Sequence, residues 1–166
     1  MIKILWHFGA PILLLLLLCT TTAQGQFGFC TGNTGDPIFT ETFGEGLFYG
    51  PPLALGSTSY QYVSGSPIDG SYTISNSTPF YNWHNITDHT ENDTNGKSFV
   101  VNADYTSGEF FRRTVTGLCE NTSYEFSSWL INLLPASGCS GNGIPINVKF
   151  QIWDGTDTNL LASGDT

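Results

Sequence analysis

After its first two dozen residues, the chain consists of short runs of aromatic and β-branched residues separated by clusters of Gly, Asn, Asp and Pro. Such runs are typical of β-strands, and the clusters between them are typical of turns. The residues that favour helices most strongly, such as Ala, Leu, Glu, Lys and Arg, are scarce in the same region. The pattern predicts an all-β fold, a two-sheet antiparallel jelly-roll sandwich.

Alternation of apolar and polar residues predicts about six to eight strands. The segments concerned are residues 39–43, 59–63, 71–74, 98–103, 110–115, 124–134, 146–153 and 160–162. The sequence Asp154-Gly155-Thr156-Asp157 is typical of a hairpin turn between the last two segments. Val148, Phe150 and Ile152 are expected to point inward, and Trp129 is expected in the core with Phe150.

The first 23 residues, MIKILWHFGAPILLLLLLCTTTA, have the form of a secretory signal peptide: one lysine, an apolar run and then small residues. A membrane anchor is the alternative, but the run from Ile12 to Leu18 is shorter than the ~20 apolar residues that span a bilayer. Cleavage is expected after Ala23, or after Gly25. Residues 24–166 then form one secreted or cell-surface domain, with no membrane insertion after cleavage.

The charge of this domain limits its partners. Without the leader, the chain has 14 acidic residues and four basic ones, namely Lys97, Arg112, Arg113 and Lys149. Its formal charge is then −10. Such a field repels nucleic acid and anionic membranes and favours cations. We therefore expect no nucleic-acid partner.

Three cysteines, Cys30, Cys119 and Cys139, remain after the leader. An odd number in an oxidising medium indicates a free thiol, an intermolecular bridge or a partner beyond Thr166. A Cys119–Cys139 bridge would require residues 135–143 to fold back along the sheet. The chain ends soon after a short strand-like segment, so the jelly roll is expected to lack its C-terminal strand or strands.

Residues 75–97 form a long polar stretch, and stretches of that length without regular structure are often functional. Its acidic part, Asp88 to Gly96, combines carboxylates, amides and hydroxyls, which are the oxygen ligands of calcium. Asp88 and Asp93 are the candidate ligands. The loop does not match an EF-hand, since Glu91 opens the pattern and Asn102 closes it. A solvated turn is the simpler alternative.

Two further groups of residues are candidates for function. Tyr81, Trp83 and Tyr105 lie in loops or beside glycine, where flat rings can stack on sugars or can cover the core. Glu109 and Glu125 would be the carboxylate pair of a glycoside hydrolase or lyase, although each is more simply an exterior charge on a strand.

Several segments resemble the N-terminal modules of large cell-surface proteins that Bacteroidetes export through the type IX secretion system. The resemblance is carried by residues 83–103 (WHNITDHTENDTNGKSFVVNA), 39–44 (FTETFG), 117–129 (GLCENTSYEFSSW) and 147–150 (NVKF). The triplet Asp88-His89-Thr90, followed by Gly96 and a strand, is also similar to MAM adhesion domains. Both relate to jelly-roll sandwiches such as carbohydrate-binding modules.

The resemblance implies a non-catalytic module for adhesion or glycan binding, with a structural cation beside the sandwich and a glycan or a cell-surface protein as partner. Glu41 matches the acidic residue of the first strand, and Asp88 matches the aspartate of the triplet. Further ligands, and a partner for Cys30, would come from a last strand beyond Thr166. A purely architectural adhesin domain without a ligand remains an alternative.

Overall fold

The computed structural model describes residues 37–141 and 143–166. The chain divides into two compact units. Of the first unit, Pro37, Ile38 and Gly117–Ser123 are described, and the second unit consists of Phe39–Thr116 and Tyr124–Thr166. The expected signal peptide and Cys30 lie outside the described residues.

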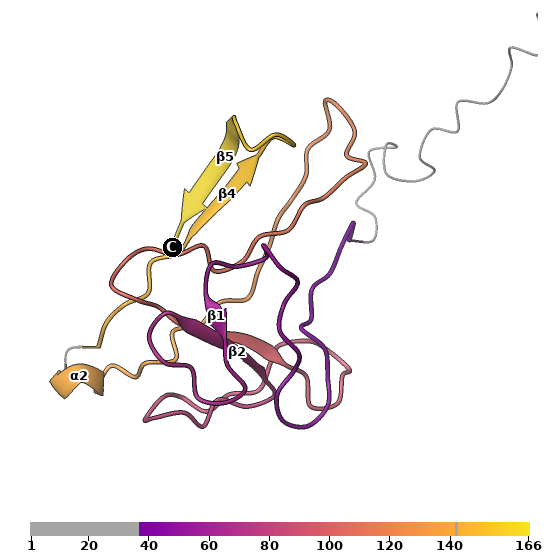
Figure 1. Ribbon diagram of the computed structural model, residues 1–166. Helices are drawn as coiled ribbons and strands as arrows, with labels where there is room; N and C mark the ends of the chain where they lie inside the picture. Colours follow the sequence, from indigo (N-terminus) through magenta and orange to yellow (C-terminus); the bar gives the residue numbers. More distant parts are fainter. Residues whose placement is uncertain (1–36, 142) are drawn as a thin grey trace, which may run out of the picture. The chain divides into compact units, whose positions relative to one another are not determined.

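A three-stranded mixed sheet lies in the second unit (Figure 1), and it consists of β1 (Gln61–Tyr62), β2 (Ser71–Ser75) and β3 (Ser98–Asn102). The central strand β2 pairs antiparallel with β3 and parallel with the very short β1. All five residues of β2 are buried, as expected of a strand that has neighbours on both edges.

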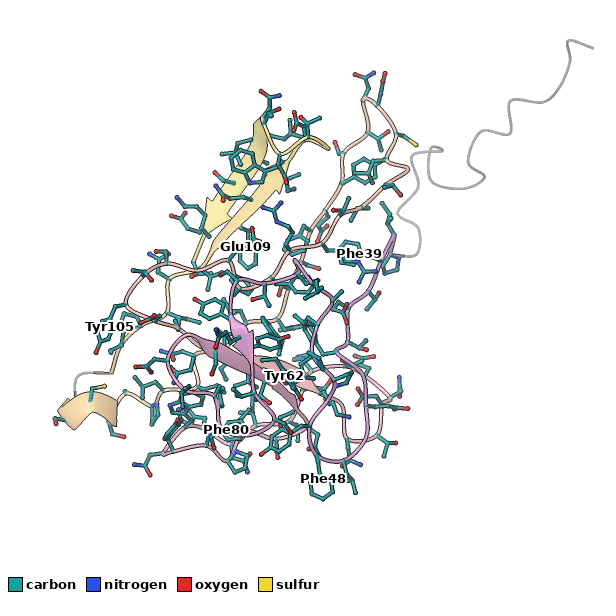
Figure 2. All side chains as sticks on the ribbon, in the orientation of Figure 1. Phe39, Phe48, Tyr62, Phe80, Tyr105 and Glu109 are labelled. Atoms are coloured by element: carbon teal, nitrogen blue, oxygen red, sulfur yellow. The ribbon has the colours of Figure 1, made fainter. Side chains whose placement is uncertain are left out.

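Aromatic and aliphatic side chains around β2 and β3 make the core. Tyr72, Ile74, Phe80 and Val100 are each at most 3% exposed, and Phe80 is labelled in Figure 2. The ring of Phe99 on β3 packs 5.1 Å from that of Tyr72, between ring centroids. Burial of these side chains is the main favourable contribution to the stability of this sheet.

The second sheet is a hairpin (Figure 1) of two antiparallel strands, β4 (Lys149–Trp153) and β5 (Leu160–Asp165). A β-bulge interrupts its register between Ile152 and Trp153. Every residue of β5 is exposed, and only Phe150 of β4 is half-buried. The turn at Asp154–Asp157 is confirmed.

The expectation of a β-rich chain is confirmed, but the described residues form two small sheets rather than a jelly-roll sandwich. The predictions for β2, β3 and the β4–β5 hairpin are confirmed, and β1 falls within the expected strand 59–63. The predicted strands at residues 39–43, 110–115 and 124–134 are wrong, because these segments have no strand pairing.

Two side chains that were expected in the core lie in solvent instead: Trp129 is 77% exposed and Ile152 is 46% exposed. Alternation along the sequence shows which residues share a face, but it does not show whether another layer covers that face. Phe150 packs against Phe126 and Phe110, so a smaller aromatic contact exists beside the hairpin.

The two described cysteines differ in their bonding. Cys119 forms a disulfide, whereas Cys139 is free and exposed, so the Cys119–Cys139 bridge does not form. Cys139 lies in the short element α2 (Gly138–Gly141), where it and Ser140 have left-handed backbone angles. Within the described part of the chain, no helix is long and apolar enough to cross a membrane.

Candidate cation site

Thr78 fixes the start of the polar loop that precedes β3. Its side chain is fully buried, and its hydroxyl donates a hydrogen bond to His84 O (2.6 Å) and accepts one from Ile86 N (2.9 Å). The amide oxygen of Asn85 in turn accepts a hydrogen bond from Thr78 N. A buried hydroxyl with both a donor and an acceptor partner gives the loop a defined starting point.

The end of the loop is held by the segment Gly44–Gly46. Gly46 N donates to both Thr94 O (3.2 Å) and Asn95 O (3.0 Å), and Thr94 N donates to Glu45 Oε2 (3.2 Å). Lys97 contributes two more links, because its backbone N–H bonds Gly44 O and its ammonium bonds Glu45 O. These contacts bring the carboxylate of Glu45 towards the acidic loop, although it is far away in sequence.

Asp88 and Asp93 direct carboxylate oxygens into one small space beside Gly96. A Cβ atom on Gly96 would stand 2.5 Å from Asp88 Cγ, and closer still to Asp88 Oδ1 and Asp93 Oδ2. Asp88 Oδ2 is satisfied by Thr90 N at 2.8 Å. Asp93 Oδ2, by contrast, is inaccessible to solvent and has no hydrogen-bond partner. Buried polar atoms in proteins normally have a partner, so this oxygen is an exception.

The electrostatics of Asp93 agree with this geometry. Burial of the carboxyl raises the pKa of Asp93 above its ordinary value, and the carboxylates of Asp88 and Glu45 raise it further. Repulsion between closely spaced carboxylates is relieved by a shared proton or by a cation. Oxygen atoms from carboxylates and backbone carbonyls are the ligands that Ca²⁺ prefers, at about six to eight per ion. Asp88 and Asp93 are thus residues of the kind that bind calcium.

The third expected ligand, Glu41, is placed elsewhere. Its carboxylate binds Arg113 Nη1 at 2.9 Å and accepts a hydrogen bond from Phe43 N, and it lines a depression of about 340 Å³. The structure therefore brings Asp88 and Asp93 together, with Glu45 rather than Glu41 as the third carboxylate nearby. Among residues 37–141 and 143–166, no group of three or more acidic, histidine or cysteine side chains already has the spacing of a metal site.

The expected ligand-binding aromatics are divided between two places. Tyr81 and Trp83 pack together with 5.2 Å between ring centroids, and Trp83 also meets Phe80 of the core. Tyr105 lies in another loop (Figure 2), with 99% of its surface exposed. Tyr81 and Trp83 are therefore in part a cover for the core, which was the alternative for these residues.

A further aromatic pair joins the acidic loop to residues 124–134. The imidazole of His89 stacks on the indole of Trp129 with 3.6 Å between ring centroids and 8° between ring planes. His84 N also donates to Leu133 O at 2.8 Å. Two separate contacts thus connect this loop to the same segment.

The two glutamates proposed for glycoside chemistry are not joined by any described contact. Glu109 forms an ion pair with Arg112 (2.8 Å), and Arg112 also binds Asp157. This arrangement is a surface ion-pair network, which contributes little to stability at exposed positions.

The hairpin turn provides a contrast with the acidic loop. Asp154 accepts hydrogen bonds from the backbone and side chains of Thr156 and Thr158 and from the side chain of Asn159. Hydrogen bonds from Thr158 N and the Asn159 amide, in that order, lower the pKa of Asp154 far below its ordinary value. This carboxylate is satisfied by its own turn and needs no cation.

Asp154 makes the hairpin turn sensitive to acid. Because its pKa is lower in the folded turn than in the unfolded chain, its stabilising effect is complete above the ordinary value of 3.8 and is lost as the pH falls below it. We expect hydrogen exchange of the Thr158 amide to accelerate below about pH 4 relative to its intrinsic rate. Asp154→Asn should show weaker protection of this amide at neutral pH. Equal protection at pH 3 and pH 6 would contradict this account.

The sequence alone did not reveal three features of the site. They are the position of Glu45, the close approach of the two carboxylates to Gly96, and the stack of His89 on Trp129. Glu45 lies between two glycines and resembles a simple loop residue, so only the hydrogen bonds to residues 94 and 95 reveal its position. The signal for Gly96 was present as an Asn-Gly turn, which predicts the turn but not the approach of two carboxylates.

Comparison of the chain with protein-family models, with curated proteins and with solved structures gives no match. The resemblance to Bacteroidetes surface modules therefore remains a prediction from the sequence.

Proposed function

We propose that the chain is a secreted or cell-surface, non-catalytic binding module whose acidic loop is stabilised by calcium. The observation that carries the proposal is the buried Asp93 Oδ2, which has no hydrogen-bond partner and lies beside Gly96 together with Asp88 Oδ1. Calcium would be held by the carboxylates of Asp88 and Asp93, with Glu45 nearby. When bound, the ion would neutralise the repulsion among these groups and fix the loop that leads into β3.

Extracellular location is part of the proposal, because the expected leader directs the chain to a medium where calcium is plentiful and disulfides form. The disulfide at Cys119 is consistent with such a medium. The secreted protein should be recovered outside the cell with its N-terminus at Gln24 or Gln26. Recovery of the full-length chain from the cytosol would contradict the location.

We also propose that the two sheets are parts of a jelly-roll sandwich. The support is the exposure of apolar side chains that such a layer would cover, including Ile152 at 46% and Leu161 at 65%. Two-stranded hairpins are marginally stable alone, so β4 and β5 need a covering layer or a neighbouring strand. An experimental structure of the natural protein in which both side chains remain in solvent would overturn this assignment.

Calcium should raise the melting temperature of the secreted chain. Binding to the folded state alone adds ~2.7 kcal/mol at one hundred times the dissociation constant, which corresponds to roughly 10 °C for a chain of this size. The measurement is thermal unfolding in calcium and in EDTA. Asp93→Asn should remove most of the shift, whereas Glu41→Gln should retain it, because Glu41 pairs with Arg113.

This comparison tests the ligand set as well as the ion. Equal melting temperatures of the wild-type chain in calcium and in EDTA would remove the cation from the proposal. Loss of the shift in Glu41→Gln but not in Asp93→Asn would instead favour the ligand set that the resemblance implies.

A further inference from the structure

The ring of Trp129 stacks on a neighbouring ring, while most of its surface remains in solvent. It is 77% exposed, and the imidazole of His89 lies parallel to the indole at 3.6 Å. Since the imidazole covers one face of the indole, an exposure this large leaves the opposite face open. The pair therefore presents one free, flat aromatic surface with a fixed orientation.

We infer that the free face of Trp129 is a stacking surface for a neutral sugar ring, and that the calcium-stabilised loop sets its orientation. The inference deepens the proposed function and rests on it for the role of the ion. Aromatic rings offer an apolar face on which the C–H groups of a pyranose can pack, while polar groups at the rim bind hydroxyls. The residues after His89, namely Thr90, Glu91 and Asn92, are exposed and polar.

Area and charge favour a sugar over a protein or an anionic polymer. A tryptophan side chain buries ~150–250 Å², which suits one or two sugar units, whereas a stable protein interface needs ~800 Å² on each side. The formal charge of the whole chain is −9, which disfavours nucleic acid and acidic polysaccharides. A neutral glycan is therefore the occupant that the observations favour.

The link to the cation comes from the position of His89. It directly follows Asp88, whose Oδ2 accepts the hydrogen bond from Thr90 N and so closes a turn around His89. An ion held by Asp88 Oδ1 and Asp93 would restrain the backbone that carries the imidazole. Removal of the ion should loosen the stack of His89 on Trp129. The Trp129 surface would then be less well ordered before binding, and its affinity for sugar should fall.

The test is binding of the secreted chain to soluble cellohexaose, xylohexaose, mannohexaose and chitohexaose, measured by tryptophan fluorescence and calorimetry in calcium and in EDTA. At least one hexasaccharide should bind in calcium, and Trp129→Ala should weaken that binding about tenfold. Phe48→Ala, which removes a ring of nearly the same exposure (75%), should bind as the wild type does. His89→Ala should weaken binding, and His89→Phe should restore part of it because a flat ring can still stack.

Far-UV circular dichroism of each variant establishes that the fold survives. The stacking surface is overturned if no hexasaccharide binds, or if Trp129→Ala binds as tightly as the wild type. If calcium raises the melting temperature in either of these cases, the proposed function stands without the stacking surface. Sugar binding that depends on Trp129 but is equal in EDTA and in calcium would overturn the link to the ion alone.

Discussion

Gly96→Ala is expected to abolish the rise in melting temperature that calcium gives the wild-type chain. The new Cβ would enter the space shared by Asp88 Oδ1 and Asp93 Oδ2, so that either the carboxylates separate or the cation is excluded. The expected loss is the full calcium effect, ~2.7 kcal/mol at one hundred times the dissociation constant. Gly96 is buried, so a further destabilisation in EDTA is expected from the collision itself.

Gly155→Ala is the matched control for this substitution. It adds the same methyl group in a loop, but a Cβ there meets nothing within 4 Å. Its melting temperature should rise in calcium by the same amount as that of the wild type. Thermal unfolding of the three chains with and without EDTA measures the effect, and a normal calcium shift in Gly96→Ala would place the ion elsewhere.

Phe80→Ala is expected to cost ~3–5 kcal/mol of unfolding free energy, which is the usual range for removal of a buried phenylalanine. Phe80 is 3% exposed and meets Trp83 edge-on with 6.3 Å between ring centroids. Small domains are stable by only ~5–15 kcal/mol, so the variant should be close to unfolding at 37 °C. Urea denaturation followed by circular dichroism gives the free energy directly.

Phe48→Ala serves as the comparison, because the same ring is removed at a position that is 75% exposed. Its free energy of unfolding should stay within ~0.5 kcal/mol of the wild type. Equal losses for the two variants would show that the region around β2 is not the core of the molecule in solution.

The strands that the sequence predicted correctly are identified by features of their own segments or of the turn that joins them. β4 and β5 are joined by the Asp154 turn, and their alternation and turn residues give the same answer. β2 and β3 contain branched or aromatic residues, and all of β2 is buried, which favours a strand whichever neighbour it has. In these cases the pattern of residues along each segment predicts a strand, and the segment does pair with a neighbouring strand.

Residues 124–134 show why the rest could not be predicted. The segment begins with alternating apolar and polar residues and then becomes apolar on both faces, as in a covered strand. It nevertheless has no ladder partner and leaves Trp129 in solvent. Alternation describes the side chains, whereas a strand also requires backbone groups on a neighbouring segment. No property of the segment alone shows whether such a neighbour exists.

The candidate site was predictable in part for the same reason. Asp88 and Asp93 share one loop, so their residue types and spacing were enough to identify them. Glu45 and Trp129 reach the loop from other parts of the chain through hydrogen bonds and ring stacking. Contacts of this kind between distant segments leave no pattern in a single sequence.

The two-residue strand β1 has a consequence for self-association. A long, flat edge strand is a template on which other chains can add strands and grow into fibrils. β1 covers one edge of β2 with a parallel pairing of only Gln61 and Tyr62, and then leaves the sheet. That edge therefore offers an incoming chain too few aligned backbone groups to extend the sheet into an aggregate.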